Sequence, residues 1–500
     1  MLKLLATAVS AIVASLSTPN GDVLPDFSRV GYKWGDEDIP TVKVVKKISA
    51  PKGEADATKL IQDAVDGMKT PGALLLKAGT YYVDGQIKIT RSGVVIRGEG
   101  EGKTKVVARG KGRRSLFVFG EPLKIKAEPK ASSVLTEKYV PLGRMYVEVK
   151  APSKFKVGDQ VILYQEGTDE WIHAIKMDQI EQGFDAIGRL VKQWKPKEYN
   201  ITWERVVTKI DGNKIYFDNP TVLGINTEMS PSKLYVITTN RISGCGIENL
   251  TLESTFDPEI KTMHKFAGNV SREVCIDEDH GWVAVEFKAA EHSWVRDITS
   301  RYFGYGLVHL IGGAKYVTVQ NCKCLDPVSF IAGGRRYAFC FAGCQMCLVK
   351  DCLATEDRHG CVVNGRTPGP NVFVDCEIKP CYSDIGPHNR FATGCLYDRV
   401  MCAGTANARD RGSSGFGHGW AGATMVFWNT TAESFIVQNV WDVAKNYAVG
   451  CIGKQILSKD RPEGVWVSHG KNVEPSSLYE YQLQLRKEAG IKAAPAECYK

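Results

Sequence analysis

The 500-residue chain has no cysteine before Cys245 and, after its first residues, no apolar run long enough to span a membrane. It also has no zinc-finger spacing, heptad repeat or RNA-binding signature. The net charge of +8 is modest for this length and is spread along the chain, so we expect neither a nucleic-acid nor a membrane partner. With 43% hydrophobic and 24% charged residues, the composition predicts one elongated or several compact globular domains.

The one long apolar stretch lies at the N-terminus. A lysine precedes apolar residues from Leu4 to about Leu16, and a Pro-Asn-Gly break follows. This pattern is typical of a secretory signal peptide (1–17), although a buried N-terminal helix has the same pattern. We therefore expect a secreted protein, with glycan acceptors at the Asn-X-Ser/Thr motifs of Asn200, Asn269 and Asn429.

Short β-branched runs that end in asparagine or aspartate recur in the second half of the chain. Aligning these polar residues gives intervals of 48, 24, 30, 24, 23 and 41 residues. A base period near 24, with no amphipathic helix between the runs, predicts an all-β solenoid, the right-handed parallel β-helix. The aligned positions form a predicted polar column: Asn249, Asp297, Asn321, Asp351, Asp375, Asp398 and Asn439.

Equivalent residues in stacked coils lie one strand spacing apart, about 4.8 Å. We interpret the polar column as structural, because its side chains can satisfy the backbone of the next coil. Cys322, Cys352 and Cys376 follow the column in three successive coils and should stack inside the solenoid. The spacing also permits disulfides between coils, and the odd total of 15 cysteines leaves a thiol unpaired if the others bridge.

The segment from Asp56 to Val106 reads as one helix, a glycine turn, three short strands and a glycine-rich corner. Its "LIQDAVD" and "KAGTYYV" resemble the capping helix and first coil of the pectate-lyase-like superfamily of secreted β-helix proteins, with Lys77 where the family often has proline. With the upstream "DFSRVGYKWGDEDIP" and the repeat, the resemblance covers residues 25–455. It implies a parallel β-helix with an N-terminal capping helix, in a superfamily that holds lyases, hydrolases, epimerases and binding proteins.

The fading of the coil pattern suggests a division of the chain. We expect a cap and first coils in 25–119, an antiparallel β-rich insertion in 120–240, coils with the candidate groove in 241–455, and a C-terminal cap with a helix in 456–500. The insertion either packs on the solenoid wall or forms a flap over a groove. Its Trp171, Trp194 and Tyr199 suit either sugar stacking or a core.

After the polar column each coil leaves the stack at the same turn, so these turns should line one edge of the solenoid. The edge collects more charged and aromatic side chains than the solvation of a turn requires, which predicts a groove. Its members are Arg301, Asp326, Arg335, Arg336, Tyr337, Glu356, Asp357, Arg358, His359, Asp384, His388, Arg390, Asp410 and Arg411. The other histidines near the coils, which we interpret as structural, are His280, His292, His309 and His418.

An edge of this kind predicts an acidic polysaccharide as the partner, because arginine binds carboxylate or sulfate oxygens through a two-pronged fork. In β-elimination a base removes the proton alpha to a uronate carboxylate while a cation neutralises that carboxylate. The candidate catalytic residues are His359, Arg358, Tyr337, His388 and Asp384. The candidate substrate-binding residues are Arg335, Arg336, Arg390, Asp326, Glu356, Asp357 and Trp171.

Other functions remain open at this point. Hydrolysis needs two carboxylates about 5–10 Å apart, which Asp326, Glu356, Asp357 and Asp384 could supply. Of the four motifs of the polygalacturonase-like branch, only "GHG" occurs, at 417–419. We therefore predict a secreted, monomeric polysaccharide lyase. The alternatives are a hydrolase, an epimerase or a non-catalytic carbohydrate-binding protein; no metal ligands are assigned, and Ca²⁺ is the one cofactor considered.

Overall fold

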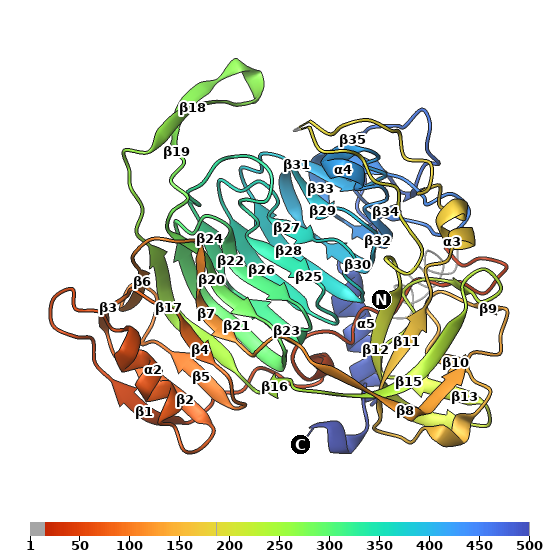
Figure 1. Cartoon of the computed structure of the whole chain (residues 1–500), viewed down its shortest axis with the longest axis horizontal. Coiled ribbons are helices and arrows are strands. Elements are labelled where there is room, and N and C mark those ends of the chain that lie inside the picture. Colours follow the sequence, from red (N-terminus) through yellow and green to blue (C-terminus); the bar gives the residue numbers. More distant parts are fainter. Residues whose placement is uncertain (1–15, 187, 500) are drawn as a thin grey trace.

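The computed structural model describes residues 16–186 and 188–499, so the predicted signal peptide (1–17) lies almost wholly outside the described residues. The dominant feature is a 26-stranded sheet in which strands from successive coils pair in parallel. Figure 1 shows these strands stacked into a solenoid. The predicted parallel β-helix is confirmed. No helix in the described ranges is long and apolar enough to cross a membrane.

The first coils lie next to a capping helix. Helix α2 (Thr58–Asp66) buries Ile61, Ala64 and Val65 against the end of the solenoid core, as the "LIQDAVD" pattern predicts. The strands of these coils are β1 (Val44–Ile48), β2 (Gly72–Leu76), β3 (Gly79–Val83), β4 (Ile87–Ile89), β5 (Val94–Arg97), β6 (Thr104–Ala108) and β7 (Arg114–Phe119).

The coils continue after the insertion and end in a short tail. Their strands are β16 (Ile242–Ser243), β17 (Gly246–Ser254), β20 (Gly281–Phe287), β21 (Ala290–Arg301), β22 (Gly306–Ile311), β23 (Lys315–Gln320), β24 (Lys323–Leu325), β25 (Phe339–Ala342), β26 (Leu348–Ala354), β27 (Cys361–Val363), β28 (Asn371–Ile378), β29 (Asp384–Pro387), β30 (Ala392–Asp398), β31 (Met401–Ala408), β32 (Gly422–Trp428), β33 (Thr431–Val437), β34 (Tyr447–Val449), β35 (Ile452–Gln455) and β36 (Val465–Val467). The short helix α4 (Ser414–Gly417) precedes β32, and the hairpin of β18 (Lys261–Lys265) and β19 (Ser271–Cys275) projects from the stack (Figure 1).

A column of left-handed residues marks one turn of the coils. The backbone φ lies between 52° and 59° at Asn249, Asp297, Asn321, Asp351 and Asp375. Asparagine and aspartate adopt this conformation more readily than other residues with a side chain, which explains their recurrence. Asn321 also donates from Nδ2 to Oδ1 of Asp297 in the neighbouring coil, at 2.6 Å. These residues therefore recur because of the backbone conformation of the turn, whereas the predicted bonds from their side chains to the backbone of the next coil are not found among the described residues.

The last two predicted members of the column are wrong. Strand pairing places Arg399, with φ of 53°, rather than Asp398 beside Asp375. In the next coil Asn429, with φ of 46°, takes the position that the sequence pattern gave to Asn439. The pattern failed because Arg399 has a different side chain at the same turn; its guanidinium pairs with the carboxylate of Asp375 at 2.5 Å.

The predicted cysteine ladder is present without disulfides. Cys322, Cys352 and Cys376 are all at most 3% exposed, and Cys352 pairs in register with Cys376. All fifteen cysteines are free thiols, so the interior ones act as small apolar side chains.

The three predicted glycan acceptors differ in accessibility. Nδ2 of Asn429 donates to the carbonyls of Val473, Pro475 and Ser476, which leaves no room for a glycan. Asn200 accepts the N–H of Gly167 and is half-buried. Asn269, in the projecting hairpin, is exposed and remains the best predicted acceptor.

The insertion forms an antiparallel sheet of six strands in the order β10-β13-β12-β11-β15-β8. It shares one apolar core with the coils: Nε1 of Trp203 donates to Thr393 at 3.1 Å, and Nε1 of Trp420 donates to the carbonyl of Ile175 at 2.9 Å. The insertion is thus packed on the solenoid wall and is not a free flap. Its elements are β8 (Ile125–Val134), β9 (Tyr139–Val140), β10 (Tyr146–Glu148), β11 (Gln160–Gln165), α3 (Asp169–Ala174), β12 (Ile201–Asp211), β13 (Lys214–Phe217), β14 (Ile225–Asn226) and β15 (Ser232–Thr239).

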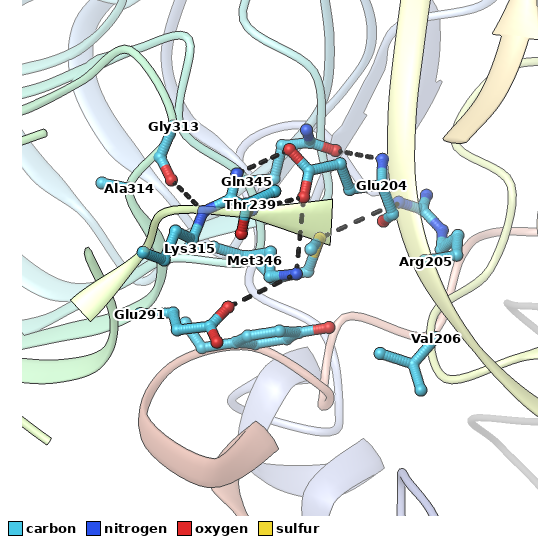
Figure 2. Close-up of polar contacts among 12 residues, drawn as sticks. Glu204, Arg205, Val206, Thr239, Glu291, Gly313, Ala314, Lys315, Gln345 and Met346 are labelled. Carbon is cyan, nitrogen blue, oxygen red and sulfur yellow. Dashed lines mark hydrogen bonds and ion pairs between the residues drawn. The ribbon is translucent and has the colours of Figure 1, made fainter. Parts of the chain in front are cut away.

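A buried charge cluster joins the insertion to the coils (Figure 2). Glu204 on β12 forms a two-pronged ion pair with Arg241, at 2.6 and 2.8 Å, and lies 3.4 Å from Nζ of Lys315 on β23. The backbone N–H of Glu204 donates to Oε1 of Gln345 at 2.9 Å. Burial raises the pKa of Glu204, but the two cations outweigh it and hold this pKa below its usual value. The Glu204 carboxylate therefore holds both cations in place and joins the insertion to the coils.

The predicted C-terminal helix is α5 (Leu478–Glu488). It does not cover the last coil as expected. Instead, Leu478 and Tyr479 pack on outward-facing residues of the sheet, such as Leu396 and Val426, together with N-terminal residues such as Phe27. The helix therefore seals an outer wall of the solenoid and holds the two ends of the chain together.

Candidate functional site

The site begins with the register of three short strands. Phe339 of β25 pairs with Cys361 of β27, which places Tyr337 beside His359 two residues earlier in each coil. Val362 pairs with Gly386 of β29, so Asp384 follows in the next coil. The rings of Tyr337 and His359 are 4.8 Å apart, one strand spacing. Stacking thus brings together three predicted catalytic residues that are distant in sequence.

His359 and Asp384 form a buried dyad through a contact between Nδ1 and Oδ1. Their exposed fractions are 1% and 9%. Burial lowers the pKa of His359, and the pull of Asp384 only partly offsets it. Burial would raise the pKa of Asp384, but His359 holds it far below its usual value. Near neutral pH the dyad is therefore a carboxylate and a neutral imidazole whose Nδ1–H points to the acid.

This arrangement leaves Nε2 of His359 as the free basic atom. Nε2 is buried and has no hydrogen-bond partner among the described residues. An unsatisfied buried acceptor is costly in a folded protein, so it marks the position where a ligand proton would be accepted. The carboxylate would stabilise the imidazolium that forms.

A second histidine lies next to the dyad. The rings of His388 and His359 are 4.8 Å apart, and Nη1 of Arg411 donates to Nδ1 of His388 at 3.0 Å. Since the guanidinium can only donate, a neutral His388 that accepts this bond at Nδ1 carries its proton on Nε2, which lies 3.3 Å from the hydroxyl of Tyr337 and 3.5 Å from the same Nη1. Burial, with His359 and Arg411, lowers the pKa of His388 to about 2.

The hydroxyl of Tyr337 is consequently an acceptor for His388, and its own proton is free to be donated. Burial raises the pKa of Tyr337 to about 12, so the phenol stays protonated at neutral pH. The ring of His418 is 5.5 Å from that of His388. His418 therefore lies in this cluster and not at a remote structural position. The sequence did not reveal this, because His418 is distant in sequence from the other members of the cluster.

Two charged residues, Asp357 and Arg336, hold the turn that carries the dyad. Asp357 is 1% exposed and accepts the N–H groups of Ala338 and Arg358 at 2.9 and 3.0 Å; burial raises its pKa to about 7. Arg336, also buried, donates to the carbonyls of Ser329 and Glu356. The structure therefore gives Asp357 and Arg336 positions that support the turn rather than ones that face a ligand.

Arg358 is the partly exposed cation of this turn. Its side chain is half-buried, and Nη1 has no hydrogen-bond partner in the described part of the chain. It lies close enough to Tyr337 and His359 to lower the pKa of both groups. A cation in this position can neutralise an anion that approaches the dyad.

Several of the other predicted edge residues form ion pairs. Arg335 pairs with Glu278 at 2.5 Å, and Asp326 pairs with Arg301 at 2.6 Å. Glu356 contacts Arg272 of the β18–β19 hairpin and the hydroxyl of Tyr382. Glu278, Arg272 and Tyr382 were not predicted from the sequence. Glu278 and Arg272 belong to a segment outside the repeat, and the charge of these two residues was the one sequence feature that could have indicated them.

The predicted aromatic contact does not line this edge. Trp171 is 2% exposed and packs against Phe391 in the core shared by the insertion and the coils, with ring centroids 5.0 Å apart. Its apolar neighbours leave it no surface for a sugar. Arg390, in contrast, is half-buried and lies 4.9 Å from the ring of Phe416, on the other side of the histidine cluster.

A metal site is not assembled by the described residues, which contain no group of three or more His, Cys, Asp or Glu side chains placed to hold an ion.

No protein-family model and no curated protein matches this chain. Among solved structures, the gp54 tailspike of Acinetobacter baumannii bacteriophage AP22, in complex with capsular saccharide, has a TM-score of 0.43 at 12% identity over 83% of this chain. The chain spans 63% of that tailspike's length. An alginate lyase from Paenibacillus sp. (TM-score 0.41, 9% identity, 86% of this chain and 100% of that one) and pectate lyase Pel9A (0.39, 10%, 87% and 82%) are also similar. At these identities the likeness says nothing of activity.

Proposed function

We propose that the protein is a polysaccharide lyase that cleaves an acidic polysaccharide by β-elimination at His359, at a uronate unit of a chain that is sulfated or unsulfated. The observation that supports this most is the free Nε2 of His359, which is backed by the Asp384 carboxylate and lies near Arg358, whose Nη1 has no hydrogen-bond partner in the described part of the chain. A base next to a cation is the pair of groups that proton abstraction alpha to a carboxylate requires.

Each group has one role in the proposed reaction. Arg358 neutralises the substrate carboxylate, which makes the alpha proton more acidic, and Nε2 of His359 accepts that proton. The electron pair of the broken C–H bond forms the new double bond as the bond to the glycosidic oxygen breaks. Tyr337 gives its proton to that oxygen, and His388 holds the phenol in place.

Access to the dyad requires a small movement. His359 and Tyr337 are 1% and 2% exposed, so a sugar reaches Nε2 only when neighbouring side chains move, and the proposal assigns this shift to the half-buried Arg358. The attraction between this guanidinium and the substrate carboxylate supplies a reason for that shift.

Hydrolysis fits the geometry less well. A hydrolase needs one carboxylate free as a base or nucleophile and a second that holds a proton. Here Glu356 and Asp326 each pair with an arginine, Asp384 is bonded to His359, and both oxygens of Asp357 accept backbone N–H groups.

The test is to incubate the purified protein with pectin, alginate, ulvan and sulfated glycans, following the ultraviolet absorbance of unsaturated uronates together with reducing ends. We expect both signals to rise for at least one acidic substrate. His359→Ala should lower turnover at least about 100-fold without changing the melting temperature by more than a few degrees. His309→Ala, a half-buried histidine of β22, is the matched control and should keep its activity.

Other outcomes would contradict the proposal. Reducing ends without absorbance would indicate a hydrolase. Saturable binding of a glycan without either signal would indicate a non-catalytic binding protein. Full activity of His359→Ala would remove this residue from the mechanism. Secretion, a monomeric state and a glycan at Asn269 belong to the same proposal.

A further inference from the structure

A cavity of about 300 Å³ lies between the insertion and the coils, beyond the histidine cluster. The insertion contributes Lys192, Gln193, Glu198 and Tyr199, and the coils contribute Arg366, Arg390, Phe416 and Gly417. Its volume is at the lower end of the range for small-molecule sites and suits one sugar unit. Figure 1 shows the insertion beside α4, where the two parts meet.

The cavity is cationic and its cations are available. Neither Arg366 nor Arg390 nor Lys192 has a carboxylate within ion-pair distance in the described part of the chain. The one carboxylate of the lining belongs to Glu198, whose side chain is exposed. Three cations against one acid favour an anionic ligand, and two guanidinium groups can bind carboxylate or sulfate oxygens in a fork.

The walls of the cavity are aromatic. The guanidinium of Arg366 lies 5.8 Å from the ring centroid of Tyr199, and that of Arg390 lies 4.9 Å from the ring of Phe416. Tyr199 is itself stacked on Trp194, with ring centroids 3.9 Å apart. Aromatic faces next to cations match a sugar ring that carries an acidic group.

The two halves of the cavity are held in a fixed relation. The N–H of Lys192 donates to the carbonyl of Phe416, and Nε1 of Trp194 donates to the carbonyl of Gly417, both at 3.2 Å. A Cβ on Gly417 would lie 2.3 Å from the carbonyl oxygen of Lys192, so only glycine allows this close approach. With the buried Glu204 cluster, these contacts preorganise the cavity and reduce the cost of ordering it on binding.

The cavity adjoins the proposed site. Arg390 follows His388 by two residues, and its N–H donates to the carbonyl of His418, whose ring is 5.5 Å from that of His388. A chain bound across His359 could therefore place a neighbouring sugar unit in the cavity.

We propose that this cavity is a subsite for a carboxylated or sulfated sugar unit, held by Arg366, Arg390 and Lys192 and stacked on Tyr199 or Phe416. The inference rests on the proposed function for its location along the substrate, and its binding chemistry can be tested separately. It assigns the insertion a part in substrate recognition.

Binding is measured by calorimetry with trigalacturonate, trimannuronate, a 6-sulfated galactose trisaccharide and neutral galactotriose as the probes. The protein carries His359→Ala so that no probe is cleaved. We expect at least one anionic probe to bind with an affinity that falls with added salt, and galactotriose to bind much more weakly. A preference for the uronates or for the sulfated probe shows whether the two guanidinium groups bind carboxylate or sulfate more tightly.

Arg366→Ala tests the subsite directly, because this exposed side chain makes one hydrogen bond in the described part of the chain, to the carbonyl of Glu198, and its loss should not disturb folding. It should weaken binding of the anionic probe about 10- to 100-fold, and Lys192→Ala should weaken it less. Lys195→Ala, in the same loop but outside the cavity, is the matched control and should bind as the parent does. Equal binding of all variants, or no saturable binding of any anionic probe, would overturn the subsite.

Kinetics separate this inference from the proposed function. If wild type cleaves an acidic polysaccharide, Arg366→Ala should raise KM with little change in kcat, because the contact is remote from the reacting bond. Cleavage with an unchanged KM would overturn the subsite and leave the lyase standing. Binding that depends on Arg366 without any cleavage would support the subsite and contradict the lyase.

Discussion

At the residue scale, the proposed elimination depends on the protonation of the His359–Asp384 dyad. Burial and the nearby arginines lower the pKa of His359, while Asp384 remains ionised. The base form of His359 should therefore persist below about pH 6.5, the ordinary pKa of histidine. Turnover should show no loss centred at that value as the pH falls.

Asp384→Asn tests the role of the carboxylate. The amide removes the charge that stabilises the imidazolium and can reverse the tautomer of His359, so we expect kcat to fall about 10²- to 10⁴-fold. Steady-state kinetics on the substrate found in the panel provide the measurement. Asp398→Asn, another buried aspartate changed to its isostere, is the control and should keep full activity. A variant with wild-type kcat would show that the acid has no positioning role.

Part of the site follows from the sequence at this scale. Tyr337, His359 and Asp384 could be brought together from the 24-residue period alone, because strand stacking converts the repeat into proximity. The roles of Asp357 and Arg336 could not be predicted, since their buried bonds to backbone groups depend on how the turn folds. Trp171 was ambiguous because aromatic residues serve cores and sugar sites equally.

At the element scale, helix α5 is attached to the coils through a buried acid. Oδ2 of Asp398 accepts from the hydroxyl of Ser477, the N-cap residue, and from the N–H of Tyr479, at 2.7 and 2.8 Å. Oδ1 has no partner among the described residues. Burial raises the pKa of Asp398 to about 7, from 3.8.

This shift predicts a pH-dependent stability. Between pH 3.8 and about 7 the folded protein retains a proton that the unfolded chain has released, so the free energy of unfolding falls as the pH rises through this window. Asp398→Asn keeps an acceptor for both donors and removes the charge. We expect its melting temperature to exceed that of wild type by about 2 °C or more at pH 8, and to converge with it near pH 4. A lower melting temperature at pH 8 would mean that the ionised acid stabilises the start of α5.

The capping helix and the strands of the coils were predictable because both have a strong local period. The register of the column at Asp398 and Asn439 was not predictable. The left-handed turn tolerates Arg399, and the neighbouring Asp398 fits the sequence pattern of the column better than Arg399 does. The place of α5 also depends on an outer apolar face of the sheet, which alternation within single strands hardly reveals.

At the scale of the whole molecule, the insertion and the solenoid behave as one packed unit. Glu204→Gln would leave Arg241 and Lys315 buried without their shared anion, so we expect the free energy of unfolding to fall by about 3–5 kcal/mol. Denaturant unfolding measures the change. Glu228→Gln, which breaks an exposed pair with Lys138, should cost less than about 1 kcal/mol. Equal costs for both variants would contradict the role of the buried cluster.

In the proposed reaction the polysaccharide is cleaved by elimination and not by addition of water. Mass spectrometry of the products formed in ¹⁸O-labelled water distinguishes the two reactions. Elimination predicts a new non-reducing end that is lighter than the hydrolysis product by one water molecule, with no ¹⁸O taken up at the broken bond, and no such product from His359→Ala. Products that gain one ¹⁸O atom at each cleavage would contradict it.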